Sequence, residues 1–265
     1  MIFFFWSVKY LGKIISVVNQ KGGVGKTTTA VNLVSGIGLM GKKVLLIDAD
    51  PQGNTTSGYG INKKEVEFSS YNILNGTVKA AEAIVKTKFK GVDVIPSSMD
   101  LAAAEIELIE IENRHERLKL ALATLRESYD YIFIDCPPSL GLITINALCA
   151  SDTFLVPIQC EYYAMEGLSQ LMSTVRQIKR LYNDTLELEG VVLTMYDGRL
   201  NLTQQVVGEI KKFFDKKLYS TPIPRGVRLS EAPSFGLPIQ YYDKRSKGAL
   251  AYDALAKEFL KRNRG

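Results

Sequence analysis

The chain has 265 residues, a formal net charge of +5 and a mean hydropathy of +0.01, with 46% hydrophobic and 23% charged residues. These proportions are typical of a soluble globular protein and exclude disordered and fibrous classes. No apolar run approaches the ~20 residues that a membrane-spanning helix needs. Three cysteines, an odd and low number, favour a reducing compartment over a disulfide framework.

The first residues do not share the pattern of the rest of the chain. Ile2–Trp6 is a short apolar and aromatic run with no basic segment before it and no small-residue cleavage site, so we predict no secretory signal peptide. A packed edge segment and a disordered tail remain open. We favour a start codon placed too early, with Val8 or Leu11 as the alternative bacterial start. Residues 1–12 are therefore interpreted as an N-terminal extension and 13–265 as the domain.

Short apolar runs rich in β-branched residues alternate with segments of helical period along the rest of the chain. The runs are apolar throughout, which indicates strands buried on both faces, as in a parallel sheet covered by helices. We therefore predict one α/β domain with a doubly wound, mostly parallel sheet flanked by helices. The expected strands are Lys13–Asn19, Lys43–Asp48, Val92–Pro96, Tyr131–Asp135, Thr153–Ile158 and Gly190–Met195, and the expected helical segments include Leu101–Leu125, Met165–Leu181 and Gly248–Arg262.

The strongest motif follows the first strand, where Asn19–Thr28 reads NQKGGVGKTT. Its glycines let successive backbone N–H groups wrap a phosphate at a helix N-terminus. Lys26 is expected to reach the β- and γ-phosphates, and the Thr27 hydroxyl to bind Mg²⁺. Gln20 stands where the usual spacing has its first glycine. A phosphate-binding loop of a P-loop NTPase is predicted, with further contacts from Gly22, Gly23, Val24, Gly25 and Thr28.

Acidic side chains end two further strands. Asp48 and Asp50 lie two positions apart at the end of the second strand, and Asp135 ends the run Tyr131–Asp135. Carboxylates at the carboxyl ends of parallel strands face the mouth where ligands bind. There they contact Mg²⁺ through its waters or orient an attacking water. For Asp48 and Asp50 the alternative is that they cap a following turn.

Other chemistry is not indicated. His115 is the single histidine and no cysteine lies near it in sequence, so a zinc site is not predicted, and no G-x-S-x-G motif occurs. We interpret His115 as a surface residue and the acidic run Glu105–Glu116 as a solvated helix face. Cys136 is interpreted as a small packing residue rather than a nucleophile.

The loop motif carries a family resemblance. Lys21–Thr27, KGGVGKT, is similar to the deviant Walker A motif of the ParA/MinD family of P-loop ATPases. Later stretches resemble the chromosomal ParA proteins called Soj more specifically, and the similarity runs from about Lys13 to the C-terminus. These stretches are Gln159–Gly167, Thr194–Arg199 and Ile223–Ser234.

The resemblance implies an ATPase that uses ATP and Mg²⁺. In the family the early lysine, here Lys21, reaches across a dimer interface to the partner subunit's nucleotide, so a homodimer sandwiches ATP. The resemblance gives Asp50 the role of positioning water, beside Lys21 and Lys26 as the other catalytic residues. Asp48 and Asp135 are implied to contact the metal through water.

The resemblance also implies where the base lies. The adenine is expected against the segment around Pro224, with Met195 and Gly226 as further binding residues. Gly226 stands where the family often has Asn. This departure removes a side-chain contact to the base.

Basic residues are concentrated late in the chain: residues 190–265 hold 14 Lys/Arg against 7 Asp/Glu, and residues 1–189 hold 19 against 21. This distribution favours a polyanionic partner, with a solvated basic surface as the alternative. The resemblance places non-specific DNA contacts at Arg199 and Arg228. It also implies a ParB-like centromere-binding partner that stimulates ATP hydrolysis and a cytoplasmic, nucleoid-associated location. Further candidate DNA contacts are Arg225, Lys244, Arg245 and Lys247. Arg199, Arg225 and Arg228 are expected in loops after strands, and the three later residues in the loop before the last helix.

The alternative function is a MinD-like membrane-associated ATPase that regulates the placement of cell division. It needs a C-terminal amphipathic helix. Leu255, Phe259 and Leu260 are possible anchors, but Tyr252, Leu255 and Phe259 more naturally dock on the domain, so we expect no membrane partner. A metabolic P-loop enzyme lacks a motif for a second substrate. A cluster-bridging iron–sulfur protein is not favoured because the cysteines lack its Gly-rich context; they are Cys136, Cys149 and Cys160.

Overall fold

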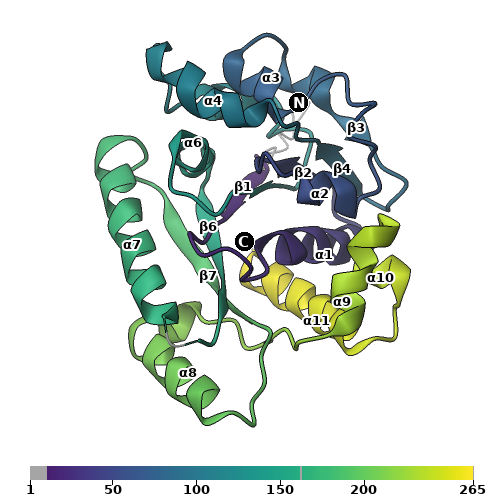
Figure 1. Ribbon diagram of the computed structural model, residues 1–265, viewed down its shortest axis with the longest axis vertical. Coiled ribbons are helices and arrows are strands. Elements are labelled where there is room, and N and C mark those ends of the chain that lie inside the picture. The colour runs from purple at the N-terminus through teal and green to yellow at the C-terminus, as the bar shows by residue number, and fades with distance from the viewer. Residues whose placement is uncertain (1–10, 162, 265) are drawn as a thin grey trace, which may run out of the picture.

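A sheet of order β3-β4-β2-β5-β1-β6-β7 forms the centre of the computed structural model, which describes residues 11–161 and 163–264 (Figure 1). The expectation of an N-terminal extension falls almost wholly on residues outside this part of the chain and stays a prediction. The strands are β1 Lys13–Val17, β2 Val44–Asp48, β3 Val85–Lys86, β4 Val92–Ile95, β5 Tyr131–Asp135, β6 Thr153–Gln159 and β7 Glu187–Thr194.

The sheet is parallel except at one edge, which confirms the predicted α/β class. The short strand β3, which the sequence analysis did not identify, pairs antiparallel with β4. β1 lies between β5 and β6, with β2 beyond β5 on one side. The chain thus changes direction across the sheet at β1, and ligands of doubly wound folds bind at such switch points.

Alternate strand residues face opposite sides and build two hydrophobic cores. Ile14 and Ile132 belong to one core, whereas Ile15 and Phe133 belong to the other. The first core is covered by α3 Ser70–Asn75, α4 Leu101–Glu107, α5 Arg117–Leu122, α6 Leu142–Ala150, α7 Ala164–Leu181 and α8 Asn201–Phe214. The second is covered by α1 Lys26–Leu39, α9 Val227–Glu231, α10 Ile239–Tyr242 and α11 Lys247–Arg262, while α2 Asn54–Gly58 packs on α1.

The predicted helical stretch Leu101–Leu125 is broken in the structure. The 3₁₀ turn η2 Leu108–Glu110 follows α4, and Asn113 takes a left-handed φ of 56° before α5 begins. The interpretation of the acidic run as a purely solvated face is wrong at Glu105. Its carboxylate accepts the N–H groups of the first two residues of α6, at 3.0 and 3.3 Å, because these N–H groups have no acceptor within the helix.

The C-terminal helix α11 docks on α1, as Figure 1 shows. Leu255 and Phe259 are each 0% exposed and Tyr252 is 1% exposed. These side chains belong to the core and are not free to enter a bilayer. Among the described residues, no helix is both long and apolar enough to cross a membrane.

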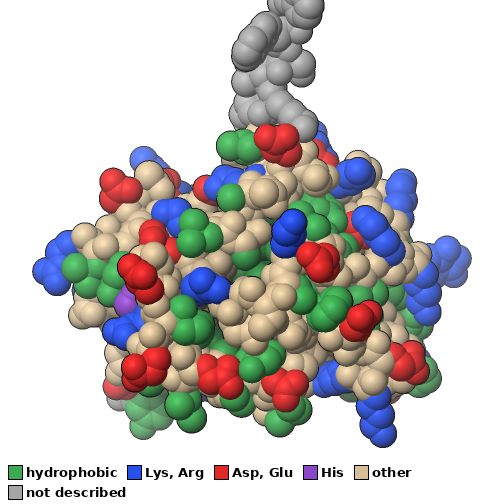
Figure 2. Space-filling view, turned by 90° about the horizontal axis from the view of Figure 1, so that it is seen from above, with side chains coloured by type: hydrophobic (Ala, Val, Ile, Leu, Met, Phe, Trp, Pro, Cys, Tyr) green, Lys and Arg blue, Asp and Glu red, His purple; other side chains and the backbone are tan. Residues whose placement is uncertain are grey.

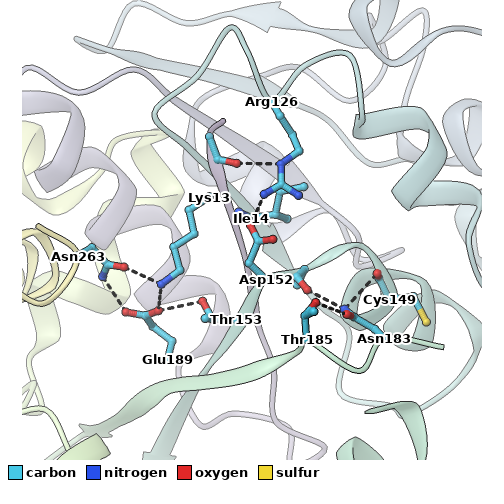
Figure 3. Close-up of polar contacts among 12 residues, drawn as sticks. Lys13, Ile14, Arg126, Cys149, Asp152, Thr153, Asn183, Thr185, Glu189 and Asn263 are labelled. Atoms are coloured by element: carbon cyan, nitrogen blue, oxygen red, sulfur yellow. Dashed lines mark hydrogen bonds and ion pairs between the residues drawn. The ribbon is translucent and has the colours of Figure 1, made fainter. Parts of the chain in front are cut away.

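A polar network ties the strands together at their amino ends, at the edge of the sheet opposite the carboxylates (Figure 3). Lys13 Nζ lies 2.6 Å from both Glu189 Oε2 and Asn263 Oδ1. Beside it, Asp152 Oδ2 accepts the Ile14 N–H at 2.8 Å and an Arg126 N–H at 2.6 Å. The network joins β1, β7 and the end of α11, and so fixes the base of the sheet that presents the site.

Candidate functional site

The loop between β1 and α1 surrounds the side chain of Lys26. Gly23 and Gly25 take left-handed φ values of 74° and 84°, a conformation that glycine adopts without steric cost. α1 begins at Lys26, whose ammonium donates to the carbonyl of Lys21 at 3.0 Å. The free N–H groups at the start of α1 and the lysine together form a cradle suited to phosphate.

Lys26 is only 7% exposed. Burial lowers the pKa of its ammonium, and the nearby Asp135 and Asp50 oppose that shift. The lysine therefore lies among the strand-end acids in a poorly solvated place, where its attraction to phosphate is stronger than in water.

Asp48 and Asp135 are side by side because β2 and β5 pair in register at these residues. Asp48 is fully buried: its Oδ2 accepts the backbone N–H and the hydroxyl of Thr56, each at 2.7 Å, and its Oδ1 accepts the Asp50 N–H at 3.2 Å. Burial raises the pKa of Asp48 to about 6 against these hydrogen bonds. The turn-capping alternative is thus realised at Asp48, and its metal contact through water stays a prediction.

Asp135 has one occupied and one free carboxylate oxygen. Oδ2 accepts the hydroxyl of Thr55 at 2.8 Å, whereas the buried Oδ1 has no hydrogen-bond partner within residues 11–161 and 163–264. Burial, with the neighbouring Asp48 second, raises the pKa of Asp135 to about 7, and the hydroxyls of Thr55 and Thr27 oppose the rise. A buried carboxylate oxygen without a donor, near a threonine hydroxyl, fits a hydrated Mg²⁺.

Asp50 follows the same strand as Asp48 and is 7% exposed. Its Oδ1 accepts the Gln52 N–H at 2.9 Å, which closes a turn before Gly53 and α2. The turn therefore holds the carboxylate through its Oδ1 atom.

A cavity of about 460 Å³ opens beside the loop. One wall is formed by Gly25, Thr27 and Thr28, and another by residues of α2. Three residues predicted from the resemblance to bind the base line the same cavity from far along the chain: Met195, Pro224 and Gly226. A backbone hydrogen bond of 2.9 Å from Tyr196 N to Ile223 O joins the two segments that carry them.

Lys21 does not line this cavity. It borders a second hollow, together with Tyr163, Glu166 and Gln170 among others, and its ammonium forms an ion pair with Glu161. The two lysines of the motif thus leave the loop in different directions. Lys26 lies inside the phosphate cradle, and Lys21 lies outside it with 39% of its side chain exposed.

The basic candidates fall into separate places. Arg199 is 89% exposed, on the β7–α8 loop, and pairs with Asp197 at 2.7 Å. Arg228, expected in a loop, lies in α9, 3.0 Å from Glu231 and 3.8 Å from Asp243. Asp243 is followed by exposed Lys244 and Arg245 before Lys247, the first residue of α11. Arg225 is exposed but also lines the cavity.

In Figure 1, α9 and the start of α11 lie near α10, on the opposite side of the molecule from α7. Figure 2 shows the face that carries α3 and α4, where basic, acidic and hydrophobic side chains are interspersed without a patch of one charge.

Sequence reasoning missed the partners of the acids. Thr55 and Thr56 contact Asp135 and Asp48, and Glu161 contacts Lys21. Two consecutive threonines directly after the acidic turn were a signal for the first contacts. Nothing in the local sequence indicated the contact of Glu161.

The comparisons with known proteins agree with this geometry. A family model described as an AAA domain matches residues 12–188. The chain is 57% identical to the sporulation initiation inhibitor protein Soj of Bacillus subtilis, over 94% of this chain and 98% of that protein. It is 49% identical to the chromosome partitioning protein ParA of Myxococcus xanthus, over 96% and 89%.

Solved structures share the fold. Cobyrinic acid a,c-diamide synthase from Mycobacterium smegmatis, with a bound ATP analogue and magnesium, is 35% identical, with a TM-score of 0.83 and 95% of both chains covered. A plasmid partition protein from Borrelia burgdorferi is 30% identical, with a TM-score of 0.75, over 95% of this chain and 99% of that one. The chain is thus an ATPase, and it belongs to the ParA/Soj family of partitioning ATPases, with the deviant Walker A motif of the ParA/MinD superfamily.

Proposed function

We propose that the chain is a nucleotide-operated switch for chromosome or plasmid partitioning. ATP closes a sandwich homodimer that binds double-stranded DNA without sequence preference, and hydrolysis, stimulated by a ParB-like partner, releases it. The position of Lys21 carries the proposal. The phosphate cradle already holds Lys26, whereas Lys21 lies outside it beside a separate open hollow, where a second copy can approach.

The proposed chemistry uses groups already close together. Lys26 and the N–H groups of the loop hold the phosphates, and the Thr27 hydroxyl and Asp135 Oδ1 hold Mg²⁺ directly or through its waters. Bound Mg²⁺ supplies charge neutralisation on the phosphate oxygens. Asp50 orients the attacking water, and Lys21 of the second subunit adds a further positive charge beside the phosphates. None of these groups is a strong general base, so we expect slow turnover.

The base is proposed to lie against Pro224 and Met195, which line the cavity from the segments after β7 and before α9. Gly226 faces it without a side chain, so the backbone and these two residues supply the contacts. The cavity thus brings the proposed phosphate-binding residues at the start of α1 together with residues up to about 200 positions later in the sequence.

DNA binding is proposed at Arg228 with Lys244, Arg245 and Lys247, and at Arg199 on a separate loop. Such contacts go to backbone phosphates and carry no base specificity. Closing a dimer doubles them, which converts weak binding by each subunit into avidity that depends on ATP. Arg225 is a candidate for both the DNA-binding surface and the nucleotide site, because it is exposed and also lines the cavity. A cytoplasmic protein that associates with the nucleoid follows from this activity.

The test is the fluorescence anisotropy of a labelled random-sequence duplex titrated with the Asp50→Ala protein, with ATP and with ADP, across a salt series. We expect binding with ATP only, weakening steeply with salt because counterions are released. Arg228→Glu should abolish it, while Arg180→Glu, which changes an exposed arginine on α7, should not. Absence of binding in both nucleotide states would overturn the proposal, and binding to anionic vesicles instead would favour the MinD-like alternative.

A further inference from the structure

The short helix α2 contacts both buried acids at once. Thr55 and Thr56 are each 0% exposed, and their hydroxyls donate to Asp135 Oδ2 at 2.8 Å and to Asp48 Oδ2 at 2.7 Å. Asn54, Ser57 and Gly58, the remaining residues of α2, line the nucleotide cavity. The five residues of α2 therefore connect the lining of the nucleotide cavity to the carboxylates at the ends of β2 and β5.

The two acids depend on α2 to different degrees. Asp48 also accepts two backbone N–H groups, those of Thr56 and Asp50, so its carboxylate keeps its direction without a threonine hydroxyl. Asp135 Oδ2 is held by the side chain of Thr55. The χ2 torsion angle of an aspartate side chain has a broad distribution, so this carboxylate can rotate unless a neighbouring group fixes it.

The direction of the Asp135 carboxylate matters because its second oxygen accepts no hydrogen bond within the part of the chain that the structure describes. A buried oxygen without a hydrogen bond is costly, so a metal ion or a metal-bound water that satisfies Oδ1 would be favoured there. If the carboxylate rotated, Oδ1 would leave the position from which it reaches a metal. A hydroxyl on Oδ2 prevents this and supplies no charge of its own.

We propose that Thr55 is a positioning residue, whose hydroxyl holds Asp135 Oδ2 so that Oδ1 stays directed at the metal that accompanies ATP. The proposal rests on the proposed role of Asp135 in holding Mg²⁺. Partners behind a ligating carboxylate typically change metal affinity about 10–100-fold when they are removed.

The experiment measures binding rather than turnover. Fluorescence of N-methylanthraniloyl-ATP bound to the full chain is titrated with Mg²⁺ to give the half-saturating Mg²⁺ concentration, and nucleotide affinity is also measured in EDTA. The variants are Thr55→Val, which keeps the shape and removes the hydroxyl, Thr55→Ser, which restores the hydroxyl, and Asp135→Asn. Thr153→Val is the matched control, because Thr153 is a buried threonine that donates to Glu189 at 2.9 Å in the network at the opposite edge of the sheet.

We expect Thr55→Val to raise the half-saturating Mg²⁺ concentration about tenfold. Thr55→Ser and Thr153→Val should stay within about twofold of the parent, and affinity in EDTA should not change. If Thr55→Val does not fold, judged by its thermal melt, Thr55→Ala is measured in its place.

Four outcomes would overturn the inference. Thr55→Val could match the parent while Asp135→Asn requires more Mg²⁺, which leaves the proposed role of Asp135 intact and removes that of Thr55. Thr55→Ser could fail to restore the parent value, which makes packing the cause. Nucleotide affinity in EDTA could fall in Thr55→Val, which places the defect in the cavity. If Asp135→Asn itself changes nothing, the proposed metal role of Asp135 fails, and the inference fails with it.

Discussion

Lys21 and Glu161 form an ion pair between the phosphate-binding loop and the segment after β6, 140 residues apart in the sequence. Both side chains are about two-fifths exposed, at 39% and 43%. The pair holds the lysine against its own subunit, at the rim of a hollow that lies apart from the nucleotide cavity. A lysine that serves a second subunit must leave this contact when the dimer closes.

Lys21→Ala and Glu161→Gln should therefore have opposite effects on ATP-dependent dimerisation. The alanine variant should remain monomeric with ATP while keeping nucleotide affinity, because Lys26 is untouched. Glu161→Gln frees the lysine. Since an exposed ion pair contributes about 0–1 kcal/mol and closing a homodimer breaks one pair in each subunit, the dimer dissociation constant should fall by at most about 30-fold. Sedimentation velocity across an ATP series measures both, and a Glu161→Gln protein that cannot dimerise would show that the glutamate supports the closed state.

Asp50→Ala should separate nucleotide binding from turnover. The carboxylate is held by its turn and is proposed to orient water, so its loss should lower kcat about 100-fold, as misplacement of a reacting group does, without preventing the ATP dimer. Phosphate release measured with and without DNA gives the rate. Asp184→Ala, at an exposed position after α7, is the control for loss of a negative charge. Turnover retained by Asp50→Ala would contradict the assigned role.

The network at the amino ends of the strands predicts a pH dependence of stability. Burial alone would raise the pKa of Glu189, but the Lys13 ammonium and hydrogen bonds from Asn263 and Thr153 outweigh it and hold the pKa below its ordinary value. A depressed carboxyl pKa contributes stability above the unfolded value, about 4.3, and this contribution is lost as pH falls through the lower folded value.

Glu189→Gln should therefore lower the free energy of unfolding by about 1–3 kcal/mol at neutral pH, because the hydrogen bonds to the charged form are lost. The difference from the parent should shrink below pH 4. Urea denaturation at pH 7 and at progressively lower pH measures it. Glu187→Gln, an exposed change on the same strand, is the control. If Glu189→Gln lowers the free energy of unfolding by the same amount at every pH, the effect is due to packing instead.

The six strands expected from the sequence are present because each is a continuous apolar run, and burial on both faces leaves no other arrangement for it. β3 is two residues long and too short to show a hydrophobic periodicity, so only its pairing with β4 identifies it as a strand. The acids were predictable because a parallel sheet brings strand ends together. The hydroxyl of Thr55 was not, because its bond to Asp135 spans 80 residues and depends on how α2 packs. Likewise, the local sequence around Glu105 reads as a solvated face, and only the position of α6 makes it a cap.

Gly226 provides the last prediction, on recognition of the base. It lines the cavity with an extended φ of −155°, which any residue can adopt, and a Cβ built there meets only the tip of Leu229, at 3.9 Å, among the described residues. Gly226→Asn, which restores the residue frequent in the family, should therefore fold with a stability change within about 0.5 kcal/mol.

The added amide can donate to or accept from a base edge, a bond worth about 0.5–1.5 kcal/mol net. The affinity for ATP should accordingly rise about two- to tenfold, and that for GTP should not rise in parallel. Equilibrium binding of fluorescent ATP and GTP analogues measures both, with Gly208→Asn on α8 as the control for an added side chain outside the cavity. Because the phosphates are proposed to lie against α1 and its loop, a base-specific gain from Gly226→Asn would assign the part of the cavity that Gly226 lines to adenine. An equal gain for both nucleotides would place the new side chain on the ribose or phosphates instead.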